Sequence, residues 1–339
     1  MSIITKIMGA GALVALSASF NQSANSDTIR GIDPANITRA LSQDNTQGIP
    51  EEFAKPAESL SMNIASFRQD FALRVRQNTL GNWSDCFSTK TRTYNNAKVS
   101  QLRRDKVSSS KTDRPIIVLD PGHGHEILGS RYGYDTGAIR GGMREVDVID
   151  KVTTQLKEEL EGKLDADVVT TRAMVSDSIT LIERDSKFRA HATALQIRTE
   201  LAAHLADRYP ERRIIFVSIH ANSEAGSTAS GGMVFYYGEG GSADSAPSRK
   251  LAQSIASNYK LRAGARTITA QGDFAVLRCQ YSSTPSVLVE LGYVSNAKDR
   301  ASMKNTDALA RGLANGIASY LKLQRPEPSL VQIAELSVK

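Results

Sequence analysis

The sequence predicts an α/β fold, a three-layer sandwich in which a largely parallel central sheet is flanked by helices. Short β-branched apolar runs recur at 116–119, 214–219 and 287–291, and such runs are typical of buried strands. Between these runs, apolar residues spaced three and four positions apart predict amphipathic helices. Strands that alternate with helices in this way form βαβ units, in which the strands lie parallel.

The first expected helix lies upstream of these strands. Leu60, Ile64, Phe67 and Phe71 follow one another at helical spacing, which predicts an amphipathic helix that ends before Gly81. Its apolar face could pack on the main domain, bind a partner or cover a functional site. Packing is the default expectation.

The main domain continues with alternating elements. Val148, Val152, Leu156 and Leu160 lie four apart and predict a helix whose first turn contains Glu145. The remaining strands are expected at 168–171, 232–237 and 274–278, and the remaining helices at 183–208, 248–261 and 306–321.

The N-terminus, residues 1–20, has the pattern of a secretory signal peptide. Lys6 precedes an apolar run from Ile7 to Leu16, and small residues follow. A membrane span would need about 20 apolar residues, so an uncleaved anchor is the weaker alternative. We therefore expect export to the periplasm or the cell exterior, with no stable membrane span after cleavage.

Three further regions are predicted. Residues 21–110 form a polar and helical N-terminal region with a linker, in which 22–56 is poor in periodic apolar residues and is expected to be loosely ordered. A polar, serine-containing run at 106–114 marks the boundary of the main domain. This domain is expected to span 111–323, and 324–339 form a tail.

Charge and cysteine content narrow the partners only partly. The chain has 42 Lys and Arg against 36 Asp and Glu, a net charge of +6, which would suit nucleic acid, anionic lipid or another anionic polymer. The excess is spread along the chain without a basic stripe carrying interleaved aromatic residues, so no nucleic-acid partner is expected. Cys86 and Cys279 could form one disulfide or remain two buried thiols.

Three side chains form a pattern typical of a catalytic metal site. The strand at 116–119 leads into Asp-Pro-Gly, which forces a turn and places His123 at the carboxyl edge of the sheet. His220 ends the strand at 214–219, and Glu145 follows a glycine-rich loop. A lone loop histidine would more often have no functional role, but the repeated strand-plus-histidine unit weakens that alternative. Two imidazoles and one carboxylate leave a fourth tetrahedral position for water, as in catalytic zinc sites.

These residues lie in motifs that resemble those of the zinc-dependent N-acetylmuramoyl-L-alanine amidases of bacterial cell walls, amidase type 3. The motifs are LDPGHGH at 119–125, GAIRGGMRE at 137–145, SIHAN at 218–222 and VLVELGYVSN at 287–296. They occur in order within a region from about Arg114 to Leu321, and an ordered set is far more specific than one motif.

The resemblance implies a zinc ion held by His123, Glu145 and His220, and peptidoglycan as the substrate. It also implies hydrolysis of the amide bond between N-acetylmuramic acid and L-alanine. Glu290 lies within an apolar strand, where a carboxylate is costly to bury without a metal, a cation or a catalytic function. In the family, the matching glutamate acts as general base toward water and then as general acid toward the leaving amine.

The chain departs from the family pattern after GHG, where glycine is usual. Here His125 and Glu126 open a longer loop. His125 could contact substrate or compete with His123 for the metal, and His123 is kept as the ligand because the motif aligns there. His191 and His204 fall outside the motifs and are expected at the surface or in packing.

Two other functions remain open at this point. One is a zinc hydrolase of similar fold that acts on another N-acylated amino acid or peptide. The other is a non-catalytic wall-binding protein, against which the intact ligand set and Glu290 argue. Control by an activator protein, or autoinhibition by the N-terminal segment, is a further hypothesis about partners.

Overall fold

The computed structural model describes residues 51–76, 114–125, 134–172, 187–209, 212–225, 228–238, 245–280 and 283–323. The chain divides into two compact units, residues 1–58 and 59–339. The second unit contains α3 (Glu51–Arg76) from Ser59 onward together with the sheet and all later helices. The expected signal peptide and C-terminal tail lie outside the described residues.

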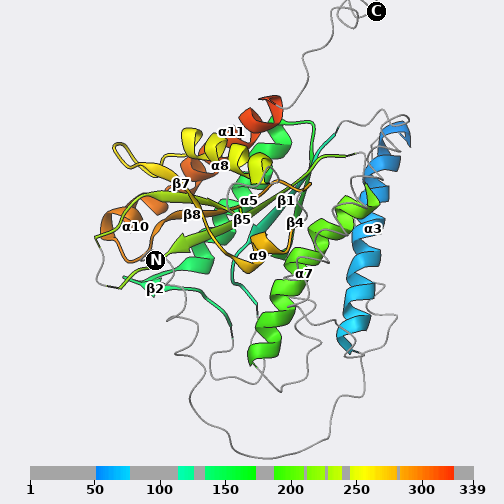
Figure 1. Ribbon diagram of the computed structural model, residues 1–339, viewed down its shortest axis with the longest axis horizontal. Coiled ribbons are helices and arrows are strands. Elements are labelled where there is room, and N and C mark those ends of the chain that lie inside the picture. The colour runs from blue at the N-terminus through cyan, green and yellow to red at the C-terminus, as the bar shows by residue number, and fades with distance from the viewer. Residues whose placement is uncertain are drawn as a thin grey trace, which may run out of the picture. The chain divides into compact units, whose positions relative to one another are not determined.

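Within the described residues, a six-stranded mixed sheet forms the centre of the second unit (Figure 1). Its strands are β1 (Ile116–Pro121), β4 (Asp167–Thr170), β5 (Ile214–Asn222), β6 (Gly232–Tyr236), β7 (Thr267–Gln271) and β8 (Ser286–Tyr293), in the order β4-β1-β5-β8-β6-β7. The first four strands in this order run parallel, β6 runs antiparallel to β8, and β7 is parallel to β6. The expected largely parallel sheet is therefore confirmed.

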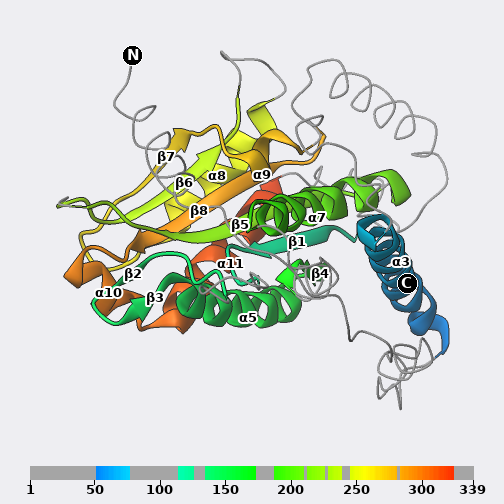
Figure 2. The same cartoon turned by 90° about the horizontal axis from the view of Figure 1, so that it is seen from below.

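Helices cover both faces of this sheet (Figure 2). One face packs against α5 (Glu145–Lys163), α8 (Ala246–Asn258) and α11 (Thr306–Leu323), and the other against α7 (Lys187–Arg208), α9 (Ala275–Arg278) and α3. In β1, Ile117 and Leu119 face the first group, whereas Ile116 and Val118 face the second. Burial on both faces explains why this strand is a continuous apolar run, and it confirms the three-layer sandwich.

From Leu60 onward, α3 packs through the apolar face that the sequence predicts. Leu60, Phe67 and Phe71 are 7, 5 and 0% exposed and share one core cluster with α7. Arg74 Nη2 also forms an ion pair with Glu200 Oε2 of α7 at 2.8 Å. Packing, the default expectation for this helix, is therefore confirmed.

One strand prediction is wrong. The segment 274–278 contains the short helix α9, and the edge strand is β7 instead. Val276 and Leu277 are buried against the α7 face, and a short apolar run fits a buried helical turn as well as a strand. The strand β7 gives a weak sequence signal because its side chains are mostly exposed, with Ile268 49% exposed.

The stretch 22–56 is also less irregular than expected, because its last residues begin α3 at Glu51. Glu, Ala and Lys near this start are good helix formers, and acidic residues are favourable at a helix N-terminus. Among the described helices, none combines the length and apolar composition that a membrane span requires. Cys279 is disulfide-bonded, so the free-thiol alternative is wrong for it, and Cys86 lies outside the described residues.

Candidate active site

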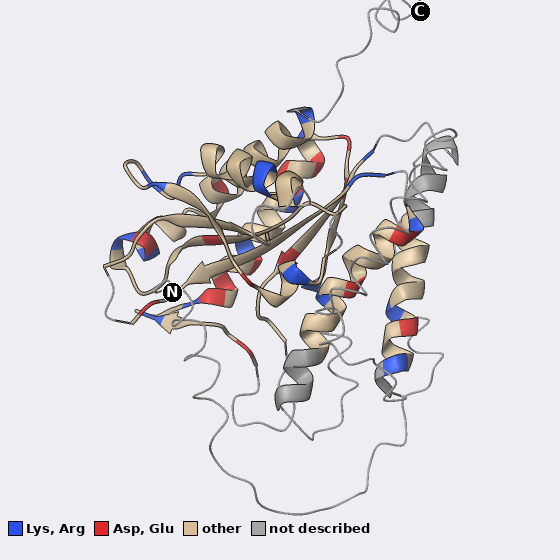
Figure 3. Cartoon of the chain, viewed as in Figure 1, with Lys and Arg blue, Asp and Glu red and all other residues tan. Residues whose placement is uncertain are grey.

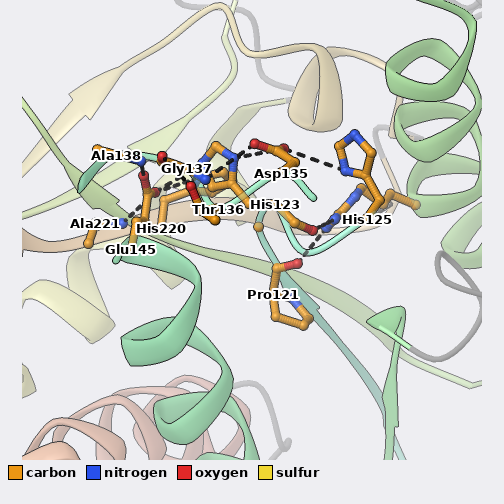
Figure 4. A network of polar contacts seen from close by, with 12 residues as sticks. Pro121, His123, His125, Asp135, Thr136, Gly137, Ala138, Glu145, His220 and Ala221 are labelled. Atoms are coloured by element: carbon orange, nitrogen blue, oxygen red, sulfur yellow. Dashed lines mark hydrogen bonds and ion pairs between the residues drawn. The ribbon is translucent and has the colours of Figure 1, made fainter. Parts of the chain in front are cut away.

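His123 lies directly after β1, at the carboxyl edge that the sequence predicts. Gly122 passes so close to His220 that an added Cβ would come within 2.3 Å of the His220 Cε1 atom. His123 itself has a φ of +55°, which is uncommon for a residue other than glycine. This turn places the two imidazole rings side by side, with centroids 5.0 Å apart (Figure 4).

The buried side chain of Arg198, on α7, holds the strained turn. Its Nη1 donates to Asp120 Oδ1 and to the Pro121 carbonyl, each at 2.6 Å, and its Nη2 donates to the His123 carbonyl. Arg172 donates to the same His123 carbonyl. Backbone strain of about 1–3 kcal/mol persists only where the surroundings over-determine the conformation, and these bonds supply that constraint.

Glu145, the first residue of α5, is held by two backbone amides. The Ala138 N–H donates to Oε2 at 2.9 Å, and the Ala221 N–H donates to Oε1 at 3.0 Å. Gly137 has a φ of +63°, and a Cβ there would lie 2.5 Å from Oε2 of Glu145. Glycine is therefore required at this point of the glycine-rich motif, both for the backbone conformation and for the space that the carboxylate occupies.

The three ligands predicted from the sequence converge. Nε2 of His123 lies 3.1 Å from Oε1 of Glu145, and Nδ1 of His220 lies 3.2 Å from the same oxygen. The donor atoms of all three residues lie within 4.8 Å of one another. Throughout the described ranges, no other group of three or more His, Cys, Asp or Glu donors is gathered in this way. We refer to these residues as the His–Glu–His cluster.

Asp135 is a site residue that the sequence reasoning missed. Its Oδ2 lies 3.0 Å from Nδ1 of His123, and its Oδ1 accepts a hydrogen bond from the Gly137 N–H at 3.2 Å. A carboxylate on one imidazole nitrogen fixes the ring and directs the other nitrogen toward a metal. The available signal was a carboxylate two residues before the glycine-rich motif.

His125 lies on the other side of Asp135 and outside the His–Glu–His cluster (Figure 4). Its side chain is buried, and Nδ1 is 3.5 Å from Asp135 Oδ2. The geometry therefore favours His123 over His125 as the ligand. The His204 ring packs 4.9 Å from that of Phe67, as expected for a packing residue, and the side chain of His191 lies outside the described part of the structure.

The charges of the cluster depend on one another. Burial lowers the pKa of His123, but hydrogen bonds to Asp135 and Glu145 outweigh burial and raise this pKa to about 10. Burial raises the pKa values of Asp135 and Glu145, yet their histidine partners hold both well below the usual range. The site thus holds a cationic imidazole between two carboxylates, a charge balance in which a divalent cation can replace the proton.

Glu290 lies on β8, opposite His220 in the register of the two parallel strands. Its Oε2 is buried and has no hydrogen-bond partner among the described residues. Burial, followed by the negative charge of Glu145, raises the pKa of Glu290 to about 8, although His123 opposes this shift. A carboxyl group with a pKa near neutrality can both accept and donate a proton under physiological conditions.

These features define a class of protein, an α/β hydrolase with a possible metal site and a proton-transferring carboxyl group at the carboxyl edge of its sheet. Residues 117–319 match the model of the N-acetylmuramoyl-L-alanine amidase family, Amidase_3. The chain belongs to this family of amidases. The matched region lies inside the expected main domain, 111–323.

Curated relatives agree with the family assignment. The chain is 29% identical over 209 residues to the germination-specific N-acetylmuramoyl-L-alanine amidase of Bacillus subtilis, covering 60% of this chain and 79% of that protein. It is 33% identical over 215 residues to the uncharacterised protein YqiI of the same organism, covering 60% and 84% of the two chains. It is 24% identical over 253 residues to the amidase AmiC of Escherichia coli, covering 61% and 53%.

Solved structures also match the chain. One is an N-acetylmuramoyl-L-alanine amidase from Clostridium difficile, with a TM-score of 0.47, 26% identity, and coverage of 63% of this chain and 100% of that chain. Another is the CwlD amidase from Clostridioides difficile, solved in complex with the GerS lipoprotein, with a TM-score of 0.49, 25% identity, and coverage of 62% and 100%.

Proposed function

We propose that this amidase cleaves the bond between N-acetylmuramic acid and L-alanine in peptidoglycan with zinc as its cofactor, held by His123, Glu145 and His220. The observation that carries this proposal is the convergence of the three donors within 4.8 Å beside Glu290. A tetrahedral zinc ion with bonds of about 2.0–2.1 Å separates its ligand atoms by roughly 3.3 Å. Small side-chain shifts would bring the donors to that spacing.

Zinc, when bound, supplies Lewis acidity that polarises the scissile carbonyl and acidifies water. Glu290 moves the proton: it accepts one from the attacking water and delivers it to the amine nitrogen of L-alanine as the C–N bond breaks. The products are a lactyl carboxylate on the sugar and a stem peptide with a free amino group. Burial of Glu290 Oε2 without a partner leaves this oxygen available for the transfer.

The supporting residues keep the cluster in place. Asp135 holds Nδ1 of His123, so Nε2 faces Glu145. The Ala138 and Ala221 amides hold the carboxylate of Glu145 in its ionised form. Ligand groups that are positioned before the metal arrives bind it more tightly, because less freedom is lost on binding.

The location and the partners follow from the substrate. Peptidoglycan lies outside the cytoplasmic membrane, and the apolar run from Ile7 to Leu16 supports export of this enzyme. Residues 111–323 form the catalytic domain in this proposal, and 21–110 are the region through which an activator or autoinhibition would act. The tail at 324–339 has no assigned function.

Replacing Glu290 by Gln tests the proposal. The change preserves size but removes the carboxylate's ability to accept a proton, so release of stem peptides from purified peptidoglycan should fall about 10²–10⁴-fold. Zinc content, measured by mass spectrometry, should stay near one ion per chain. Glu158→Gln makes the same chemical change on an exposed part of α5 and should keep the wild-type rate.

Three results would contradict the proposal. Near-normal turnover by zinc-loaded Glu290→Gln would remove the proton-transfer role, and loss of zinc would make Glu290 a ligand. Release of products other than stem peptides with a free N-terminal alanine would identify a different amide substrate. Mass spectrometry of the released material distinguishes the last outcome from the first two.

A further inference from the structure

A cavity of about 560 Å³ lies at the tip of the hairpin formed by β2 (Ile139–Arg140) and β3 (Met143–Arg144). Its other wall is α10 (Ala297–Met303) with the residue that follows it. The charged side chains that line it are Arg144, Asp147, Lys151, Arg300 and Lys304. We call this cavity the hairpin pocket. In Figure 3, basic residues colour both the hairpin and α10, which lie at the same end of the sheet.

The positive charge of the hairpin pocket is largely uncompensated. Arg144 and Asp147 bind each other through two hydrogen bonds of 2.6 and 2.7 Å, so their charges cancel. Lys151 and Lys304 are exposed and make no ion pair or side-chain hydrogen bond within the described residues. Arg300 adds a third cation, and three net positive charges around one cavity favour an anionic ligand.

Arg300 is an ordered part of this pocket. Its Nη1 donates to the Val294 carbonyl at 2.8 Å, which fixes the side chain. The guanidinium also lies against the turn of the hairpin, where a Cβ on Gly141 would come within 2.6 Å of Nε. Gly141 has a φ of +54°, so glycine meets both the conformational and the spatial requirement. A guanidinium held in advance loses little freedom when it binds an anion.

The hairpin connects this pocket to the His–Glu–His cluster. At its base, Ala138 and Glu145 belong to the cluster, and at its tip the turn at 141–142 lines the pocket. Three residues of extended chain separate base from tip, a distance of roughly 10 Å. A substrate peptide in extended conformation covers the same distance in about three residues.

We propose that the hairpin pocket binds an oxyanion of the cell-wall substrate, and thereby selects substrates that carry negative charge about three residues beyond the scissile amide. This inference rests on the proposed function, since it takes the His–Glu–His cluster as the point of cleavage. A carboxylate of the stem peptide and a phosphate of a wall-linked polymer offer the same chemistry to Lys151, Arg300 and Lys304.

A charge-reversal double variant, Lys151→Glu with Lys304→Glu, tests the pocket. The matched control is Lys157→Glu with Lys298→Glu, which makes the same charge change on α5 and α10 at residues that do not line the cavity. Both are compared with wild type on soluble muropeptides whose stem carboxylates are free or amidated. The ratio of kcat/KM for free over amidated substrate should fall about tenfold in the pocket variant, through KM, and should persist in the control.

A second arm identifies the source of the oxyanion. Walls with and without their phosphate-bearing polymer are digested by the same variants. If the pocket takes phosphate, the pocket variant should lose its preference on polymer-bearing walls and keep the muropeptide ratio. Loss in either arm that spares the control supports the proposal. An unchanged ratio in both arms, or an equal fall in the control, overturns it.

Equilibrium binding separates this inference from the proposed function. Zinc-loaded protein carrying Glu290→Gln is titrated with the free-carboxylate and amidated muropeptides, with and without the pocket substitutions. This measurement needs no turnover, so it remains informative even if wild type releases no stem peptide. Tighter binding of the free-carboxylate form that the pocket substitutions abolish supports the pocket, and equal affinities for the two forms, together with no effect of the wall polymer, refute it.

Discussion

Asp135 decides how His123 is presented to the rest of the site. Its carboxylate takes one imidazole nitrogen at 3.0 Å, and the other nitrogen faces Glu145 at 3.1 Å. Asp135 also receives the Gly137 N–H, so one side chain ties the His123 turn to the glycine-rich loop. This contact links the two motifs in space although a segment of the chain separates them.

Replacing Asp135 by Ala should weaken zinc binding about 10–100-fold, because partners of this kind orient the ligand and raise its basicity. The measurement is competition with a chromogenic chelator at fixed pH. Asp165→Ala removes an exposed carboxylate, 73% exposed and paired with Arg114, and should leave zinc affinity unchanged. Wild-type affinity in Asp135→Ala would show that the contact does not position the ligand.

At the scale of elements, α7 connects the N-terminal helix to the site. Its Arg198 holds the backbone of the His123 turn, and Phe71 of α3 belongs to the same core cluster as Ile197 and Leu201. The guanidinium of Arg74 lies 5.1 Å from the Phe71 ring centroid. The described portion of α3 thus supports the helix that supports the turn.

Phe71→Ala should lower the free energy of unfolding by about 3–5 kcal/mol, since it empties a fully buried aromatic site. Chemical denaturation monitored by circular dichroism measures the change. Met62→Ala, at a position 72% exposed on the same helix, should alter stability by less than about 0.5 kcal/mol. Equal small effects of both variants would show that α3 is not docked in solution.

Turnover by Phe71→Ala also tests autoinhibition. Because α3 supports α7, loosening it should lower turnover or leave it unchanged. A rise in turnover, repeated in a chain that begins at Arg114, would instead assign an inhibitory function to the region before the main domain.

For the whole molecule, Glu290 couples stability to pH in the absence of metal. Its pKa rises from 4.5 to about 8 in the folded protein. Below about pH 4.5 both states are protonated, whereas between about 4.5 and 8 only the unfolded state releases the proton. The contribution of this group to stability is therefore fully present at low pH and lost as pH rises through about 8.

Glu290→Gln should remove this dependence. In chelator-treated protein, the variant should exceed wild type in free energy of unfolding by on the order of 2 kcal/mol at pH 9, and by much less at pH 5. Urea titrations at the two pH values measure the difference. A variant-to-wild-type difference that does not change with pH would mean that Glu290 ionises normally in the folded protein.

Much of the architecture could be predicted from local patterns. The β-branched runs indicated β1, β5 and β8, because strands buried on both faces must be apolar throughout. Histidines at two strand ends and a glutamate at a helix start indicated a metal site, because parallel strands bring their carboxyl ends to one edge. Edge elements were harder to predict: β7 is mostly exposed, and α9 is too short for periodicity to distinguish helix from strand.

By itself, the sequence determined the family, the three-layer fold and the three converging ligands, since each depends on residue types within a short window. Only the tertiary structure decided that Asp135 belongs to His123, that Arg198 holds the strained turn, and that Lys151 and Lys304 share one cavity. These are contacts between residues distant in the chain, and their geometry follows from how helices and loops pack around the sheet. A spacing pattern records the period of one element, but it carries no information about which distant side chain faces it.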